Sequence, residues 1–184
     1  MALFSKRAVL DRADIEIRNL YYSKTPSSIL NESSNTFNKY KTYDIFLSHS
    51  YQDAKIVLGV KKILEDMRYS VYVDWIEDKQ LDRSKVNKET ARILKERMKS
   101  SNCLFYLTTE NATNSKWMPW ELGYFDGVKN KVAVLPVEDI TTQSDIYIGQ
   151  EYLGIYSYIT QSYGQLFVNT SHTTRQRLNE WLEE

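Results

Sequence analysis

Four short apolar runs, separated by segments of helical periodicity, constrain the fold of this chain more than any other feature. The apolar runs cover residues 43–48, 71–75, 103–107 and 132–137. Helical spacing of apolar residues covers residues 54–67, 85–100 and 117–128. Because apolar runs of this length are typical of strands covered on both faces, the alternation predicts right-handed βαβ units. We therefore expect a flavodoxin-like α/β fold, with a central parallel sheet and helices on both faces.

The rest of the chain divides near residue 40. Residues 1–40 are predicted to form an N-terminal extension, with a helix over 8–22 followed by a polar loop. Residues 41–184 are predicted to form the main domain, which also includes an edge strand over 155–159 and a last helix over 173–182. We expect Asp53 and Ser115 to cap the helices that follow them. The chain length allows one compact domain and its extension.

Charge and apolar content exclude several classes of protein. Lys and Arg together number 24, as do Asp and Glu, so no net field attracts nucleic acid or an anionic membrane. No apolar stretch has the length of a signal peptide or a membrane span. The single cysteine, Cys103, suits a reducing compartment, and its apolar neighbours predict a buried side chain. We expect a cytoplasmic protein that contacts neither nucleic acid nor membrane.

Several catalytic motifs are missing from the sequence. There is no GxGxxG after the first strand, no phosphate-binding loop and no GxSxG elbow, and the spacing of metal ligands is absent. Neither a bound metal nor a cofactor is therefore expected. Ser48 and His49 are adjacent, but neighbouring residues of a strand point to opposite faces, which disfavours a nucleophile–base pair. A hydrolase that uses Ser48 remains a remote alternative.

Residues 114–124 hold the strongest candidate for chemistry. Trp117 and Glu121 are four residues apart, so on a helix they share one face and can contact one ligand. This helix begins at the carboxyl edge of the predicted sheet, where ligands of open α/β proteins bind. The alternatives are ordinary ones. Glu121 could be a solvated carboxylate near the positive end of the helix, and Trp117 an aromatic anchor on the sheet.

Three motifs in register resemble the TIR domain family. Residues 43–50, Tyr-Asp-Ile-Phe-Leu-Ser-His-Ser, resemble its opening strand, and residues 71–75, Val-Tyr-Val-Asp-Trp, resemble the second strand before the so-called BB loop. Residues 115–123, Ser-Lys-Trp-Met-Pro-Trp-Glu-Leu-Gly, resemble the motif that carries the glutamate of NAD-consuming TIR enzymes. The resemblance extends from residue 43 to residue 137. It implies the same α/β fold as the periodicity.

The resemblance also implies roles for individual residues. Glu121 matches the catalytic glutamate, and Trp117 matches the aromatic residue one helical turn before it. The remaining matches are to positions that line the substrate pocket, namely Ser48, His49, Asp74 and Trp75. His49 is a departure, because many TIR domains have an aromatic residue or arginine there.

The aromatic N-terminal extension and the sequence Glu-Tyr-Leu-Gly at residues 151–154 resemble the TIR proteins of the bacterial Thoeris antiphage system. This resemblance implies that NAD is the substrate, with no separate cofactor, and that the product is a cyclic ADP-ribose isomer. That nucleotide would diffuse to an NAD-degrading effector, a phage protein would be the trigger, and the chain could form a homo-oligomer. The alternative is a TIR adaptor that acts by protein–protein assembly without turnover.

Overall fold

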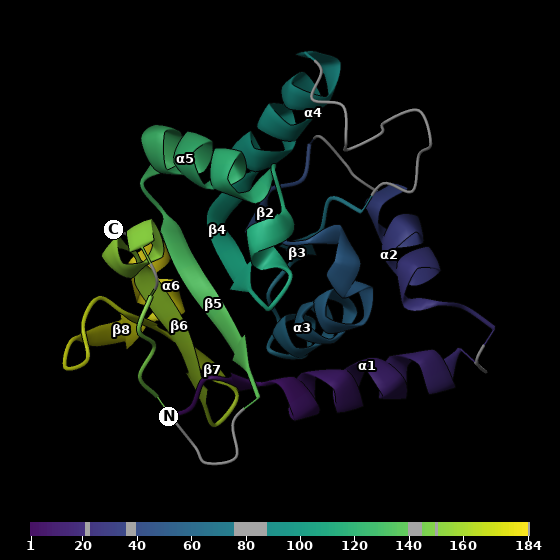
Figure 1. Cartoon of the computed structure of the whole chain (residues 1–184), viewed down its shortest axis with the longest axis horizontal. Coiled ribbons are helices and arrows are strands. Elements are labelled where there is room, and N and C mark those ends of the chain that lie inside the picture. Colours follow the sequence, from purple (N-terminus) through teal and green to yellow (C-terminus); the bar gives the residue numbers. More distant parts are fainter. Residues whose placement is uncertain (21–22, 36–39, 76–87, 140–144, 150, 184) are drawn as a thin grey trace.

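A computed structural model describes residues 1–20, 23–35, 40–75, 88–139, 145–149 and 151–183. Within these residues, eight strands form one sheet with helices around it (Figure 1). The strands are β1 (Phe4–Ser5), β2 (Tyr43–Ser48), β3 (Val71–Tyr72), β4 (Ser101–Thr108), β5 (Val132–Glu138), β6 (Ser157–Ser162), β7 (Gln165–Asn169) and β8 (Arg175–Arg177). The α-helices are α1 (Lys6–Asn19), α2 (Pro26–Asn35), α3 (Ala54–Asp66), α4 (Lys88–Lys99), α5 (Met118–Lys129) and α6 (Leu178–Glu183). Short 3₁₀ helices are η1 (Tyr51–Asp53), η2 (Ala112–Asn114) and η3 (Glu151–Ile155).

The strand order confirms the predicted α/β fold. The sheet runs β3-β2-β4-β5-β6-β7-β8, and its first five strands pair in parallel. The order of these five strands is that of the flavodoxin-like fold. Strand β2 covers the predicted residues, and β4 and β5 each extend slightly beyond theirs. In the register of β2 with β4, Ser48 lies opposite Tyr106 near the carboxyl edge.

Two apolar layers cover the two faces of the sheet. One layer is built on α1, α3 and α6, and the other on α4 and α5. Figure 1 shows α4 and α5 apart from α1 and α3. The buried helical residues of the first layer include Val9, Ala13, Val57, Leu58, Val60, Leu64, Leu178 and Trp181. Those of the second layer include Leu94, Met98, Met118, Leu122 and Phe125. Ile45, Phe46 and Leu47 of β2 alternate between the layers, because side chains of a strand alternate in direction.

The N-terminal segment packs closely on the sheet and on α3. Strand β1 pairs in parallel with the end of β5, and Ala2 exchanges two backbone hydrogen bonds of 3.0 and 2.9 Å with Gln161 of β6. Helix α1 crosses α3 at Gly59, where an added Cβ would lie only 2.0 Å from the carbonyl oxygen of Val9. The close approach of the two helices therefore depends on the missing side chain of Gly59.

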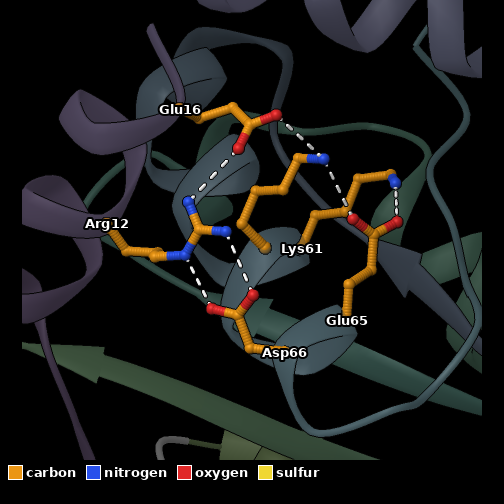
Figure 2. Close-up of polar contacts among 6 residues, drawn as sticks. Arg12, Glu16, Lys61, Glu65 and Asp66 are labelled. Carbon is orange, nitrogen blue, oxygen red and sulfur yellow. Dashed lines mark hydrogen bonds and ion pairs between the residues drawn. The ribbon is translucent and has the colours of Figure 1, made fainter. Parts of the chain in front are cut away.

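Ion pairs join α1 to α3 beside this crossing (Figure 2). The Arg12 guanidinium donates to both carboxylate oxygens of Asp66, at 2.6 and 3.0 Å, and also to Glu16 at 3.3 Å. On α3, the buried Lys61 ammonium donates to Glu65, one helical turn further on. Burial is the largest cause of the lowered pKa of Lys61, and the charge of Glu65 opposes it. The bidentate Arg12 contact ties the N-terminal helix to the domain.

Four expectations about strands and helices differ from the structure. Strand β3 ends at Tyr72, because the Trp75 amide turns back to donate to the Val73 carbonyl at 3.0 Å. The polar segment after residue 25 contains helix α2, with Leu30 in the core. The expected edge strand is β6, which lies inside the sheet because β7 and β8 extend it. The last helix begins only at Leu178, because the residues before it pair as β8. No helix in the described part of the chain has the length and apolar character needed to cross a membrane.

Candidate functional site

Glu121 and Ser48 meet in the buried interior at the carboxyl edge of the sheet. Glu121 lies in the first turn of α5 and donates its amide to the Trp117 carbonyl at 2.8 Å, which confirms their one-turn separation. Its side chain is only 3% exposed, so the alternative of a solvated surface carboxylate is wrong. The Ser48 hydroxyl, at the end of β2, donates to Glu121 Oε2 at 2.5 Å. A buried carboxylate is therefore held at a fixed place beside the end of the first parallel strand.

Trp117 precedes α5 and is almost fully buried. Its ring meets that of Trp120 edge to face, with centroids 5.4 Å apart, and it belongs to the apolar layer of α4 and α5. The cap of this helix differs from the prediction, because Trp117 occupies the N-cap position. The Ser115 hydroxyl accepts a hydrogen bond from the Met118 amide at 3.3 Å. Ser115 therefore satisfies, from outside the helix, one of the backbone N–H groups that have no partner within the first turn. Pro119 lies in the first turn, where proline is tolerated.

His49 points to the other face of the sheet. Its Nδ1 lies 2.8 Å from the Leu47 carbonyl oxygen, and its ring stacks on Trp75 with centroids 5.2 Å apart. Tyr51 also stacks on Trp75, at 4.8 Å. Ser48 is thus paired with Glu121 while His49 is packed against an indole. This arrangement contradicts the nucleophile–base pair that a Ser48 hydrolase needs.

The Asp74 carboxylate joins the end of β3 to helix α4. Its Oδ1 accepts a hydrogen bond from the Tyr72 hydroxyl at 2.9 Å and also an ion pair from Arg97 of α4. Burial, followed by the negative charge of Asp74, raises the pKa of Tyr72. Asp74 and Trp75 therefore lie just beyond the end of β3, with the Asp74 side chain held by Tyr72 and Arg97 and the Trp75 ring stacked on His49 and Tyr51. The charged loop expected after Trp75 lies outside the described residues.

Asp53 fixes the loop that follows β4. It was expected to cap α3, but its side chain makes no capping hydrogen bond. The carboxylate instead accepts from the Thr109 hydroxyl at 2.5 Å and from the Asn111 amide at 2.7 Å. Among the residues that the structure describes, no three side chains of His, Cys, Asp or Glu gather so as to hold a metal ion.

A cavity of about 450 Å³ lies at the carboxyl ends of β4 and β5, and Glu121 is not among the described residues that line it. Tyr106 forms part of its wall and lies opposite Ser48 in the strand register, and Pro119 of α5 forms another part. Burial and a hydrogen bond with Tyr152 raise the pKa of Tyr106, and the negative charge of Glu121 adds to this effect. Sequence periodicity placed Tyr106 only in a buried strand. Tyr106 lies near the site because the parallel register places it opposite Ser48, and the local sequence does not predict that register.

The parallel β3-β2-β4-β5-β6 sheet, with a buried glutamate in the first turn of the helix after its third strand in chain order, defines an α/β domain of the TIR type. A family model described as the TIR-like domain of the Thoeris protein ThsB matches residues 46–143. The chain belongs to this family.

Two curated relatives are similar to the chain. The "Probable 3' cyclic ADP-D-ribose synthase ThsB'" of Bacillus cereus (strain MSX-D12) is 46% identical over 193 aligned positions, which cover 100% of both proteins. The "Putative cyclic ADP-D-ribose synthase TIR2" of Cytobacillus dafuensis is 37% identical over 103 positions. That match covers 54% of the chain and 27% of the relative. The full-length match extends the similarity through the N-terminal segment and the C-terminal strands.

Proposed function

We propose that this chain cleaves NAD at the nicotinamide–ribose bond and converts the remainder into a cyclic ADP-ribose isomer. The observation that carries the proposal is the buried Glu121 carboxylate, held by the Ser48 hydroxyl at the ligand-binding edge of a TIR-type sheet. The names of the two relatives, both cyclic ADP-D-ribose synthases, support the same reaction. NAD is the substrate, so the reaction requires no separate cofactor.

Cleavage of the nicotinamide–ribose bond requires stabilisation by a negative charge more than it requires a proton donor. Nicotinamide leaves as a neutral ring, so its departure needs no strong proton donor. As the bond breaks, the ribose gains positive charge of the oxocarbenium type, as in the reactions of glycosidases. A fixed carboxylate beside that ribose stabilises the charge. Glu121 is the residue that we assign to this catalytic role.

Burial makes this carboxylate more effective. Electrostatic interactions are stronger in an environment from which water is excluded, because the effective dielectric constant is lower there. Glu121 is 3% exposed, and Ser48 and Trp117, which contact the same region, are 1% and 5% exposed. Ser48 orients the carboxylate, and the indole of Trp117 supplies an apolar wall one turn before it. These residues form a dry site in which an oxygen of the substrate can react before water does.

The product acts as a signal in this proposal. A phage protein triggers turnover, the cyclic nucleotide diffuses away, and an effector that degrades NAD responds to it. A homo-oligomer is compatible with this scheme. Incubation of the purified protein with NAD, with and without lysate from infected cells, followed by mass spectrometry, tests the reaction. Release of nicotinamide together with a cyclic product is expected.

A filtrate experiment separates the enzyme from an adaptor. Small molecules filtered from infected cells that contain this protein should activate a purified effector when the protein itself is absent. The matched control is filtrate from infected cells that carry Glu121→Gln. If the wild-type filtrate works only after the protein is added back, assembly rather than a diffusible nucleotide carries the signal.

A further inference from the structure

One buried carboxylate, that of Asp53, joins the segments that follow β2 and β4. Asp53 is the last residue of η1, the 3₁₀ helix after β2, and it is 6% exposed. Its Oδ2 accepts from the Thr109 hydroxyl at 2.5 Å, and its Oδ1 accepts from the side-chain amide of Asn111 at 2.7 Å. Because each carboxylate oxygen holds a different residue, Asp53 fixes the segment after β4 at two points.

Hydrogen bonds connect this anchored segment to the backbone of Glu121. The chain continues from the anchor into η2, whose first residue, Ala112, accepts at its carbonyl from the Ser115 amide at 3.1 Å. The Ser115 hydroxyl accepts from the Met118 amide at 3.3 Å, at the start of α5. Within the first turn of this helix, the Glu121 amide donates to the Trp117 carbonyl at 2.8 Å. The place at which α5 begins therefore depends on the segment that Asp53 holds.

A second path connects Asp53 to Glu121 through the end of β2. The Asp53 amide donates to the Ser50 carbonyl at 3.1 Å, and the Ser50 hydroxyl accepts from the Gln52 amide at 3.4 Å. These bonds fix η1 directly after the strand. The last residue of the strand, Ser48, donates its hydroxyl to Glu121 Oε2 at 2.5 Å. The backbone and the carboxylate of Glu121 are thus held along two separate paths, and both paths meet at Asp53.

We propose that Asp53 is a positioning residue for catalysis, because its two side-chain hydrogen bonds close this ring of contacts around Glu121. The inference rests on the proposed cleavage of NAD. A carboxylate stabilises a developing positive charge only from the correct place. A displacement of about 1 Å, caused by a change away from the reacting atoms, can lower the rate about 100-fold. Asp53 acts through the place of Glu121 and not on the substrate itself.

Two substitutions of Asp53 and one control separate positioning from a general effect on stability. Asp53→Ala removes both hydrogen bonds. Asp53→Asn keeps the size of the side chain and an oxygen that accepts from Thr109, and its amide can donate to the Asn111 side-chain oxygen once that side chain turns. Glu110→Ala is the matched control, because it removes a carboxylate from the same segment. The ion pair of Glu110 with Lys6 is exposed, and exposed ion pairs contribute little.

Steady-state kinetics of nicotinamide release from NAD measure the positioning. Each variant is assayed with the same amount of lysate from infected cells, at a temperature at which circular dichroism shows it to be folded. Asp53→Ala should lower kcat about 10- to 100-fold and change KM less than about threefold, because the place of Glu121 matters most in the transition state. Asp53→Asn and Glu110→Ala should keep kcat within about threefold of the wild type. If Asp53→Ala does not fold, Asn111→Ala removes one of the two bonds at a half-buried position and should lower kcat about three- to tenfold.

Hydrogen exchange followed by mass spectrometry tests the ring of contacts without the reaction. Amides of residues 112–121 should exchange at least about tenfold faster in Asp53→Ala than in Glu110→Ala. The inference is overturned by a wild-type kcat in folded Asp53→Ala, or by equal exchange in these two variants. Asp53→Asn as slow as Asp53→Ala would also overturn it, because the charge of Asp53 would then matter more than its hydrogen bonds. A wild-type chain that releases no nicotinamide refutes the proposed cleavage, whereas faster exchange in Asp53→Ala still supports the ring of contacts.

Discussion

Substitution of Gly59 by alanine tests the docking of the N-terminal helix on the domain. An alanine Cβ at this position of α3 would lie 2.0 Å from the Val9 carbonyl oxygen and 2.8 Å from its carbonyl carbon. Since non-bonded carbon atoms do not approach oxygen so closely, α1 must retreat by about 1 Å or α3 must deform. Such overpacking commonly costs about 1–3 kcal/mol, and because this clash is with backbone atoms that cannot rotate away, we take the upper part of the range, about 2–3 kcal/mol. Alanine also favours a helix over glycine by about 1 kcal/mol, which offsets part of the cost.

The net expectation for Gly59→Ala is a loss of about 1–2 kcal/mol in the free energy of unfolding. For a chain of this size that loss corresponds to a decrease of roughly 2–8 °C in the melting temperature. Gly127→Ala is the matched control, because it makes the same change in α5, where an added Cβ meets nothing within 4 Å. It should raise stability slightly, through helix propensity alone.

Thermal melts followed by circular dichroism, together with urea unfolding, measure both variants against the wild type. The two alanines should shift the transition in opposite directions. If Gly59→Ala melts at the same temperature as Gly127→Ala or above it, α1 does not lie against α3 as described. The ion pairs of Arg12 would then not be native contacts either.

Two further substitutions and one labelling experiment test the site and the core. Ser48→Ala removes a charge-assisted hydrogen bond, which is worth about 1.5–3 kcal/mol, so turnover of NAD should fall roughly 10- to 100-fold in steady-state kinetics; full activity would rule out orientation by Ser48. Trp117→Ala should weaken binding of NAD and raise the share of linear ADP-ribose, measured by chromatography of the products; an unchanged share would contradict water exclusion by the indole. Cys103 is fully buried and burial raises the pKa of its thiol, so a disulfide reagent should react only as the protein unfolds in urea; prompt labelling of the native chain would contradict that burial.

Periodicity predicted the parts of the fold in which local and tertiary preferences agree. Residues 43–48 are apolar nearly throughout and form an interior strand of a sheet covered on both faces, so pattern and environment coincide. The polar segment after residue 25 shows the opposite case. Its composition suggests a loop, yet it forms helix α2, because Leu30 reaches the core and packing outweighs propensity. The C-terminal strands β7 and β8 depend on pairing with distant residues, which no local window shows.

The candidate site was predictable in part for the same reason. The four-residue spacing of Trp117 and Glu121 is a local signal, and the structure preserves it as one turn of α5. The contact between Ser48 and Glu121 spans 73 residues, and the sequence predicted that both residues lie at the carboxyl edge of the sheet but not that a hydrogen bond joins them. Parallel register places Tyr106 opposite Ser48, and that register is decided by tertiary structure. The burial of Glu121 likewise follows from the packing of α5 on β2 and β4, and not from its sequence neighbours.

The catalytic assignment of Glu121 is tested most directly by mass spectrometry of nucleotides from infected cells that carry the wild type or Glu121→Gln. Glutamine keeps the size of the side chain and an oxygen that accepts the Ser48 hydrogen bond, but it removes the charge that faces the developing cation. Loss of such a charge commonly lowers the rate about 10²- to 10³-fold, or roughly 3–4 kcal/mol of barrier. The cyclic nucleotide should therefore disappear, while circular dichroism and thermal melting show that the variant remains folded. Production of the cyclic nucleotide at the wild-type level by Glu121→Gln would contradict the assignment and favour the alternative of a TIR adaptor that acts by protein–protein assembly.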